Sequence, residues 1–269
     1  MSRYERMFSA GPPDGIVMPF LMLGDPDAET TLAAVRALVQ AGADALELGM
    51  PFSDPVADGP VIQRASARAI AAGATPERCF ELIAEIRRES ASLPVGLLVY
   101  ANTVVSQGLE AFYRSVGDAG ADSVLIADVP AIEAAPFVAA ARGAGIDPVF
   151  VVPPSARASL VARVAAMGGG FTYLQGRPGV TGAVRPMHAP DPTLIAALAA
   201  EGAPPPLVGF GVSDVTHLSA ALRAGARGVI AGSAIVETLE RSNGEGRLAH
   251  GLVRALERIR PRAATLQPS

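Results

Sequence analysis

A short motif recurs along the chain and sets the order of its secondary structure. Ala41-Gly42-Ala43-Asp44, Ala119-Gly120-Ala121-Asp122 and Ala224-Gly225-Ala226-Arg227 each end a helical pattern and precede a short apolar run. Helices commonly end at a glycine, and short apolar runs are typical of strands that are buried on both faces. Strands that alternate with helices in this way predict a parallel sheet.

Apolar runs with this surrounding pattern predict strands at residues 16–22, 44–49, 95–100, 123–127, 148–152, 170–174, 206–210 and 228–231. Helical patterns lie at about 28–41, 60–71, 75–90, 108–119, 131–143, 157–167, 191–201, 214–224, 233–241 and 247–259. Eight strands in this alternation predict a single α/β domain over residues 1–269, a (β/α)8 TIM barrel with extra short helices at the N-terminus and in the βα loops. The alternative is an open doubly wound sheet, which is disfavoured because no Gly-x-Gly-x-x-Gly sequence follows the first strand.

Composition excludes several classes of function. Half of the residues are hydrophobic and 18% are charged, so the chain has enough apolar side chains for a large core. The net charge of -4 argues against nucleic acid or an anionic membrane as a partner. The longest apolar run, residues 16–23, is too short to cross a bilayer.

The cysteine and histidine residues point away from metals and disulfides. The chain has one cysteine, Cys79, so it can form no internal disulfide and no cysteine-based metal site, which fits a reducing cytoplasm. The histidines, His188, His217 and His250, lack the spacing of metal ligands, and we expect no metal site. The sequence also contains no lysine, which excludes Schiff-base chemistry and covalent pyridoxal phosphate.

Two carboxylates stand out as candidates for acid–base chemistry. In the strand at 44–49, Glu47 alternates with Leu46 and Leu48, so its side chain faces the middle of the fold if the leucines pack outward under helices. Asp58 follows on a loop that contains prolines. A buried carboxylate is costly unless it is hydrogen-bonded or neutral, and paired carboxylates are the usual means of general acid–base catalysis. The alternative is a buried glutamate that caps a loop amide and a solvated aspartate in a turn.

Glycine-rich junctions late in the chain indicate a phosphate site. Gly179-Val180-Thr181-Gly182, Gly209-Phe210-Gly211-Val212-Ser213 and Gly232-Ser233-Ala234 follow the last three predicted strands. Barrels frequently bind phosphate there, on backbone N–H groups and the N-terminus of a short helix. The alternative is a set of ordinary tight turns in a chain of 28 glycines.

Taken together, these segments resemble the tryptophan synthase alpha subunit family over nearly the whole chain. The most specific match is Pro51-Phe52-Ser53-Asp54-Pro55-Val56-Ala57-Asp58-Gly59-Pro60. The other matching segments are Arg3-Tyr4-Glu5, Leu23-Gly24-Asp25-Pro26, Tyr100-Ala101-Asn102, Ala127-Asp128-Val129-Pro130, Gly179-Val180-Thr181-Gly182, Gly209-Phe210-Gly211 and Gly232-Ser233-Ala234-Ile235-Val236.

The resemblance implies retro-aldol cleavage of indole-3-glycerol phosphate to indole and glyceraldehyde 3-phosphate. Glu47 matches the family's general acid/base, Asp58 matches the anion that stabilises the indole N–H, and Tyr173 would lie beside them. Because the indole ring accepts the electrons of the breaking bond, no cofactor is expected in this chain. The substrate-binding residues that the resemblance implies are Phe20, Leu98, Tyr100, Leu125, Ala127, Thr181, Gly182, Phe210, Gly211, Ile230, Gly232 and Ser233.

The resemblance also implies a partner. Family members pass indole to a pyridoxal-phosphate beta subunit in an alpha2beta2 complex, and Pro51 and Asp54 match positions that meet it. In the family, the equivalent of Thr181 contacts the aspartate when the sixth loop closes; here Pro178 departs from the family pattern and restricts the preceding residue. One alternative stays open, a stand-alone lyase that releases free indole for a specialised pathway. A third possibility, a catalytically poor subunit that activates its partner, is disfavoured because the pair of Glu47 and Asp58 is intact.

Overall fold

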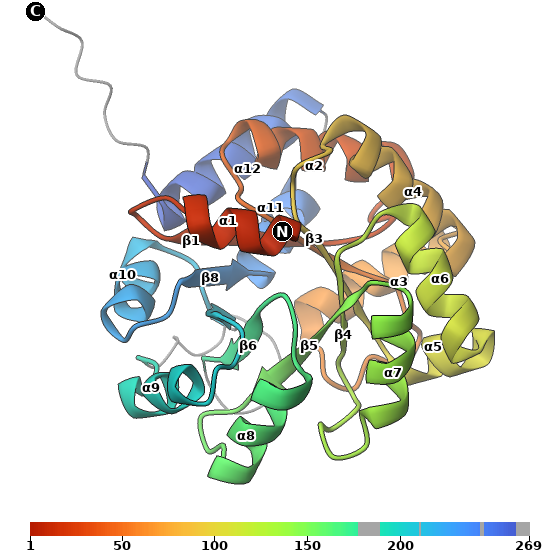
Figure 1. The fold of residues 1–269 in the computed structure, drawn as a ribbon. Coiled ribbons are helices and arrows are strands. Elements are labelled where there is room, and N and C mark those ends of the chain that lie inside the picture. The colour runs from red at the N-terminus through yellow and green to blue at the C-terminus, as the bar shows by residue number, and fades with distance from the viewer. Residues whose placement is uncertain (177–188, 210, 243–244, 262–269) are drawn as a thin grey trace, which may run out of the picture.

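The computed structural model describes residues 1–176, 189–209, 211–242 and 245–261 (Figure 1). Across these ranges eight strands form one closed parallel barrel, in which each strand pairs with the next and the last pairs with the first. The strands are β1 (Ile16–Met22), β2 (Leu46–Gly49), β3 (Val95–Val99), β4 (Ser123–Ile126), β5 (Asp147–Val152), β6 (Thr172–Gln175), β7 (Pro206–Gly209) and β8 (Gly228–Ala231). The predicted TIM barrel is therefore confirmed, and the open sheet is excluded.

Helices surround the barrel and cover its outer face (Figure 1). They are α1 (Arg3–Ala10), α2 (Ala28–Gln40), α3 (Pro60–Ala71), α4 (Pro76–Glu89), α5 (Ala101–Gln107), α6 (Leu109–Ala119), α7 (Ala135–Gly143), α8 (Ala158–Met167), α9 (Pro192–Ala200), α10 (Val215–Arg223), α11 (Ser233–Arg241) and α12 (Glu245–Ile259). No helix within the described ranges is long and apolar enough to cross a membrane.

The observed helices differ from the predicted ones at two places, each for a local reason. An additional helix, α5, directly follows β3, and Gly108 separates it from α6 with a φ of +81°, a conformation that glycine adopts without steric cost. Helix α7 begins at Ala135 instead of residue 131, with Pro136 in its first turn, where a proline removes no helical hydrogen bond. Residues 127–134 consequently form a longer βα loop than the sequence pattern indicates.

Helix α1 closes the N-terminal end of the barrel. Tyr4 is 1% exposed, and its hydroxyl lies 2.9 Å from the Ser123 hydroxyl at the start of β4. Its ring packs against Phe171, with 5.5 Å between the ring centroids. Since this end is covered, a ligand can reach the barrel interior only from the carboxyl ends of the strands.

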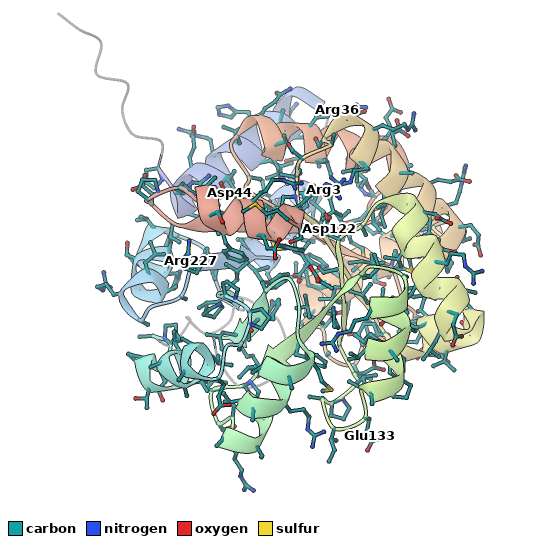
Figure 2. All side chains as sticks on the ribbon, viewed as in Figure 1. Arg3, Arg36, Asp44, Asp122, Glu133 and Arg227 are labelled. Atoms are coloured by element: carbon teal, nitrogen blue, oxygen red, sulfur yellow. The ribbon has the colours of Figure 1, made fainter. Side chains whose placement is uncertain are left out.

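The recurring Ala-Gly-Ala-Asp motif has a structural role that its sequence alone does not reveal. Asp44 accepts a hydrogen bond from the Val17 backbone N–H, and Asp122 accepts one from that of Val95, so each aspartate holds the start of the preceding strand. Asp44 also pairs with Arg260, and Asp122 pairs with both Arg87 and Arg3, which lies beside it in Figure 2. The aspartates therefore lock the strand register at the closed end of the barrel, away from the site.

Candidate active site

Glu47 occupies the interior of the barrel, as its alternation with two leucines predicts. Leu46 and Leu48 are fully buried in the layer beneath the helices, whereas Glu47 pairs in register with Phe20 of β1 and with Gly96 of β3. The Glu47 side chain is 2% exposed, and burial, followed by the charge of Asp58, raises its pKa from 4.5 to about 8. A carboxyl group with this pKa is protonated near neutral pH and can release its proton at small cost, as a general acid/base requires.

Asp58 is the second carboxylate of the site, and Tyr100 orients it. The Tyr100 hydroxyl, at the end of β3, donates to Asp58 Oδ2 at 2.8 Å and accepts from the Ala57 backbone N–H at 3.1 Å. Burial and the adjacent Asp58 both raise the pKa of Tyr100, which keeps its hydroxyl protonated as a donor. Asp58 is 6% exposed, so its carboxylate is largely shielded from solvent.

Side chains of helix α3 hold the loop that carries Asp58 through hydrogen bonds. Ser66 of α3 donates from its hydroxyl to the Phe52 carbonyl and accepts from the Phe52 N–H, both at 2.8 Å. The Phe52 ring stacks on Tyr100, with 5.1 Å between centroids and 21° between planes. Gln63 donates to the Asp58 carbonyl at 2.8 Å. These contacts fix the loop without any contribution from a ligand.

Helix α3 is itself anchored to two neighbouring elements by an ion-pair network. Arg68 forms a bidentate pair with Asp25, which is 2% exposed and follows β1, at 2.7 and 2.8 Å. Arg68 and Arg64 also bind Glu240 of α11. Planar bidentate pairs of this kind restrict orientation as well as distance. The network therefore links the helix behind Asp58 to the helix whose N-terminus carries the predicted phosphate site.

Tyr173 of β6 lies in the same interior, 5% exposed. Burial raises its pKa well above the ordinary value, and the charges of Glu47 and Asp58 raise it further, which places the three groups within electrostatic reach of one another. A Cβ atom at Gly209, at the end of β7, would overlap the Tyr173 hydroxyl. Glycine is required at residue 209 for this reason, and the sequence pattern of glycine turns did not reveal it.

Six of the predicted substrate-binding residues are apolar and would form a slot for the indole ring, and the described ones fall into two groups. Leu125 and Ile230 are buried in the interior cluster of the barrel. Leu98 and Ala127 are partly buried and pack against this cluster. Phe20 belongs to an adjoining cluster that Leu98 also contacts. A Cβ atom at residue 49 would lie 2.5 Å from Phe20 Cζ, so Gly49 makes room for this ring. Phe210, the remaining predicted slot residue, lies outside the described residues.

The predicted phosphate site lies at the start of α11. Gly232 occupies the N-cap position and Ser233 the first helical position, and no side chain caps the helix. By contrast, the Asp214 side chain already caps α10 by accepting from the Thr216 N–H at 2.8 Å. The N–H groups at the start of α11 are therefore suited to binding an anion. The Asp214 carboxylate at the start of α10 would repel one.

Gly211, after β7, has a φ of +79° and is the remaining predicted phosphate contact that the structure describes. The other predicted contacts to the phosphate and to the closing loop, Thr181 and Gly182, lie outside the described residues, as does Pro178.

Apolar side chains are exposed on three successive βα loops at the open end of the barrel. They are Val56, Val105 and Ile132, which are 72%, 54% and 67% exposed. The predicted interface residue Asp54 is exposed beside Val56, and Pro51 is partly buried. The sequence predicts an interface role for Asp54 and Pro51 but gives no sign of the apolar residues, which belong to three different βα connections, with Val105 on helix α5.

Comparisons with known proteins agree with this geometry. The family model described as tryptophan synthase alpha chain matches residues 12–261. The chain is 53% identical to a tryptophan synthase alpha chain of Shewanella amazonensis over 243 residues, covering 89% of this chain and 91% of that protein. It is 50% identical to one from Vibrio cholerae over 242 residues, which cover 89% and 90% of the two chains.

Solved structures give the same result at lower identity. A chain of the Pyrococcus furiosus tryptophan synthase a2b2 complex matches with a TM-score of 0.81 and 33% identity, covering 91% of this chain and 97% of that one. A chain of Mycobacterium tuberculosis tryptophan synthase matches with a TM-score of 0.82 and 30% identity, covering 94% and 98%.

Proposed function

This chain belongs to the tryptophan synthase alpha chain family, and we propose on that premise that it cleaves indole-3-glycerol phosphate to indole and glyceraldehyde 3-phosphate. The observation that carries the proposal is the pair of buried carboxyl groups with different environments. The pKa of Glu47 is raised to about 8, while Asp58 accepts a hydrogen bond from Tyr100 that favours its charged form. When two carboxyl groups have environments that favour different protonation states, one can act as an acid/base and the other as a fixed anion.

In the proposed reaction, Glu47 first donates its proton to C3 of the indole ring, which creates a cationic ring nitrogen. Asp58 stabilises that cation as an oriented anion, a form of transition-state stabilisation that needs no reorganisation. The bond between C3 and the glycerol side chain then breaks, and its electron pair returns to the ring. Glu47, now a carboxylate, accepts the proton of the adjacent glycerol hydroxyl as that carbon becomes the aldehyde. The ring is the electron sink, so the reaction proceeds without a cofactor and without lysine.

Substrate phosphate would bind at the backbone N–H groups of Gly232, Ser233 and Gly211, with Gly182 contributing from the sixth loop. The uncapped N-terminus of α11 supports this part of the proposal. The indole ring would occupy the slot between Phe20, Leu98 and the interior residues. A substrate held at both ends would place C3 of the indole next to Glu47.

We also propose that the open end of the barrel docks against a tryptophan synthase beta subunit. The exposed Val56, Val105 and Ile132 support an interface there, because exposed apolar side chains that gather on one face commonly mark a protein contact. Pro51 and Asp54 would contribute from the second βα loop. An interface at this rim would cover the end of the barrel opposite α1 and would direct released indole toward the partner. No observation favours the stand-alone lyase.

One experiment tests both parts. Indole release from indole-3-glycerol phosphate is measured with the purified chain alone and then with a tryptophan synthase beta subunit added. We expect slow turnover alone and strong stimulation by the partner. Absence of indole release under both conditions contradicts the reaction, whereas high turnover without any stimulation contradicts only the partner.

A further inference from the structure

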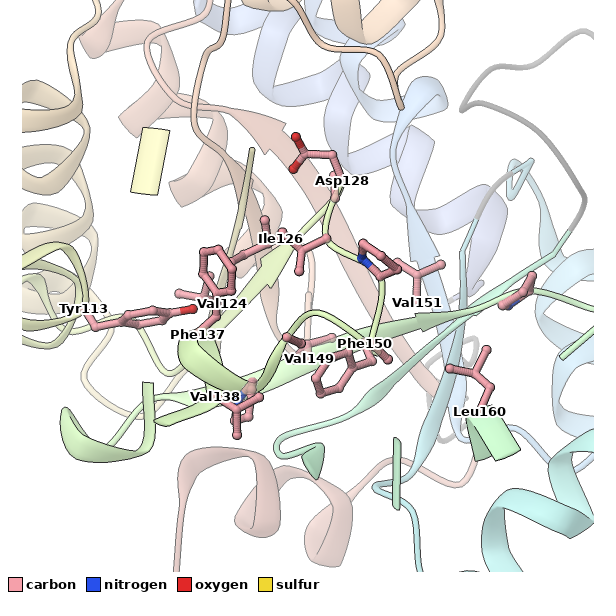
Figure 3. A pocket seen from close by; sticks show the side chains of 17 residues that line it. Tyr113, Val124, Ile126, Asp128, Phe137, Val138, Val149, Phe150, Val151 and Leu160 are labelled. Atoms are coloured by element: carbon pink, nitrogen blue, oxygen red, sulfur yellow. The ribbon is translucent and has the colours of Figure 1, made fainter. Parts of the chain in front are cut away.

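A second cavity lies outside the barrel, between β4 and β5 on one side and helices α6, α7 and α8 on the other (Figure 3). Its volume is about 420 Å³. Its lining includes outward-facing side chains of the strands, such as Val124 and Phe150, and inward-facing side chains of the helices, such as Phe137. Leu125, which faces the barrel interior, is not part of the lining, whereas Ala127 at the end of β4 borders both this cavity and the predicted indole slot.

The cavity exists because two helices fail to close over the strands. Helix α6 packs against α7 and helix α8 packs against α9, whereas α7 and α8 barely touch. The late start of α7 at Ala135 leaves the segment before it as a turn above the strand ends. Protein interiors are normally close-packed, and an apolar cavity of about 150 Å³ is already large enough to bind benzene. The space found here is large enough for a molecule of two fused rings.

One polar group inside the cavity lacks a partner. Tyr113 is 2% exposed, and its hydroxyl makes no hydrogen bond with any residue in the described part of the chain. Figure 3 shows this hydroxyl directed toward Val124 and Phe137, into the space between the strands and the helices. Burial raises the pKa of Tyr113, so the group remains a neutral donor. Buried tyrosine hydroxyls are usually hydrogen-bonded, and an unpaired one is unfavourable.

The mouth of the cavity determines which charge a ligand can carry. Asp128 lies on the cavity rim, exposed, and one of its carboxylate oxygens accepts from the Ala101 N–H at 2.8 Å. The lining contains no cationic side chain. An anionic ligand would therefore lose its hydration and meet a negative charge at the entrance.

We propose that this cavity binds a small uncharged aromatic molecule of one or two fused rings with a single hydrogen-bonding substituent. The rings would fill the space between Phe137 and Phe150, and the substituent would pair with the Tyr113 hydroxyl. The Asp128 carboxylate at the mouth excludes acids of the same shape. The site shares Ala127 with the predicted indole slot but is otherwise lined by different residues from the slot residues named above, and the proposal does not depend on the proposed reaction.

The test uses 2-naphthol as the probe, with indole-3-propanol phosphate present in excess. That phosphate keeps the ring and the phosphate of the proposed substrate and occupies the indole slot. The chain contains no tryptophan, so the fluorescence of the naphthol can be followed without tryptophan background. We expect saturable binding of one naphthol per chain, and at least tenfold weaker binding of 2-naphthoate, which carries a carboxylate in place of the hydroxyl.

Four variants, one of them a control, test where the probe binds. Tyr113→Phe removes only the hydroxyl and should weaken 2-naphthol binding by about three- to tenfold, the value of one hydrogen bond. Ala134→Leu fills the cavity from the start of α7 and should weaken 2-naphthol binding more than Tyr113→Phe does. Val138→Leu is a second filling variant, for use if the first one unfolds. Tyr4→Phe is the matched control, since it removes a buried hydroxyl at the far end of the barrel and should leave naphthol binding unchanged.

The proposal is overturned by any of three results. These are no saturable binding of 2-naphthol, binding that indole-3-propanol phosphate displaces completely, or equal binding by wild type, Tyr113→Phe and a folded filling variant. None of the three bears on indole release, so the proposed function stands or fails separately.

Discussion

The hydroxyl of Tyr100 donates a 2.8 Å hydrogen bond to Asp58, and this single contact joins the end of β3 to the second βα loop. Because the acceptor is charged, the bond both orients the carboxylate and favours its ionised form. Asp58 acts in the proposed reaction only if it is charged and correctly directed. Tyr100 is therefore a positioning residue for Asp58.

Tyr100→Phe should lower kcat for indole release by about tenfold, since a hydrogen bond to a charged group contributes about 1.5–3 kcal/mol. The ring and its stacking on Phe52 are retained, so the protein should remain folded. Steady-state kinetics should place the loss mainly in kcat, not in KM. Tyr4→Phe, which removes a hydroxyl at the closed end of the barrel, serves as the control. An unchanged kcat would show that Asp58 does not depend on this bond.

Glu47→Gln should reduce indole release by a factor of about 10²–10⁴, the usual contribution of a general acid–base group. The amide retains the shape of the side chain but cannot exchange a proton with the substrate. Binding of indole-3-propanol phosphate should change little, and calorimetric titration measures it separately from turnover. A variant that keeps more than about a tenth of the wild-type rate would remove Glu47 from the role of acid/base.

The same substitution should change how stability depends on pH. Burial raises the pKa of Glu47 from 4.5 to about 8, so the folded protein keeps a proton that the unfolded chain loses between these values. The stabilisation associated with that proton is full below the unfolded pKa and is lost as pH rises through about 8. The stability of Glu47→Gln relative to wild type should therefore increase between about pH 5 and about pH 9. Urea unfolding of both proteins at the two pH values measures it, and a constant difference would contradict the raised pKa.

Asp58→Asn and Asp54→Asn should separate catalysis from partner binding. Asp58 is buried in the site and held by Tyr100, so its loss should reduce turnover of the chain alone by about 10²-fold or more, as for other electrostatic groups of a transition state. Asp54 is exposed at the rim, and its loss should spare solo turnover while weakening stimulation by a beta subunit. The two assays are run on the same preparations. Equal losses of solo activity in both variants would mean that the two roles are assigned wrongly.

Phosphate binding should depend on backbone N–H groups more than on any side chain. Gly232→Val should raise KM by about tenfold or more, because the branched side chain obstructs the approach of an anion to the start of α11. Ser233→Ala keeps every N–H group and should change KM by less than about threefold. Competition by glycerol phosphate gives an independent measure of the same site. A severe effect of Ser233→Ala beside a mild one of Gly232→Val would contradict the backbone model.

The sequence by itself determined the barrel and the inward position of Glu47. Strand and helix patterns are local properties, and alternation with Leu46 and Leu48 is sufficient to place Glu47 on the face opposite the leucines. The segment from Pro51 to Pro60 also predicted a catalytic role for Asp58 through its resemblance to a known family. What a local pattern cannot supply is the set of partners that each residue meets from distant parts of the chain.

Tertiary structure alone decided those partners. The bond from Tyr100 to Asp58 spans 42 residues, and the pair between Arg68 and Asp25 spans 43. The pKa of Glu47 depends on burial and on the nearby Asp58, both of which arise only when the barrel closes. The cavity beside Tyr113 likewise lies where α7 and α8 barely touch. The spacing of apolar residues along one helix does not specify its distance from the next helix. Periodicity specifies which face of an element is buried, whereas hydrogen bonds, ionisation and voids depend on the distances between elements.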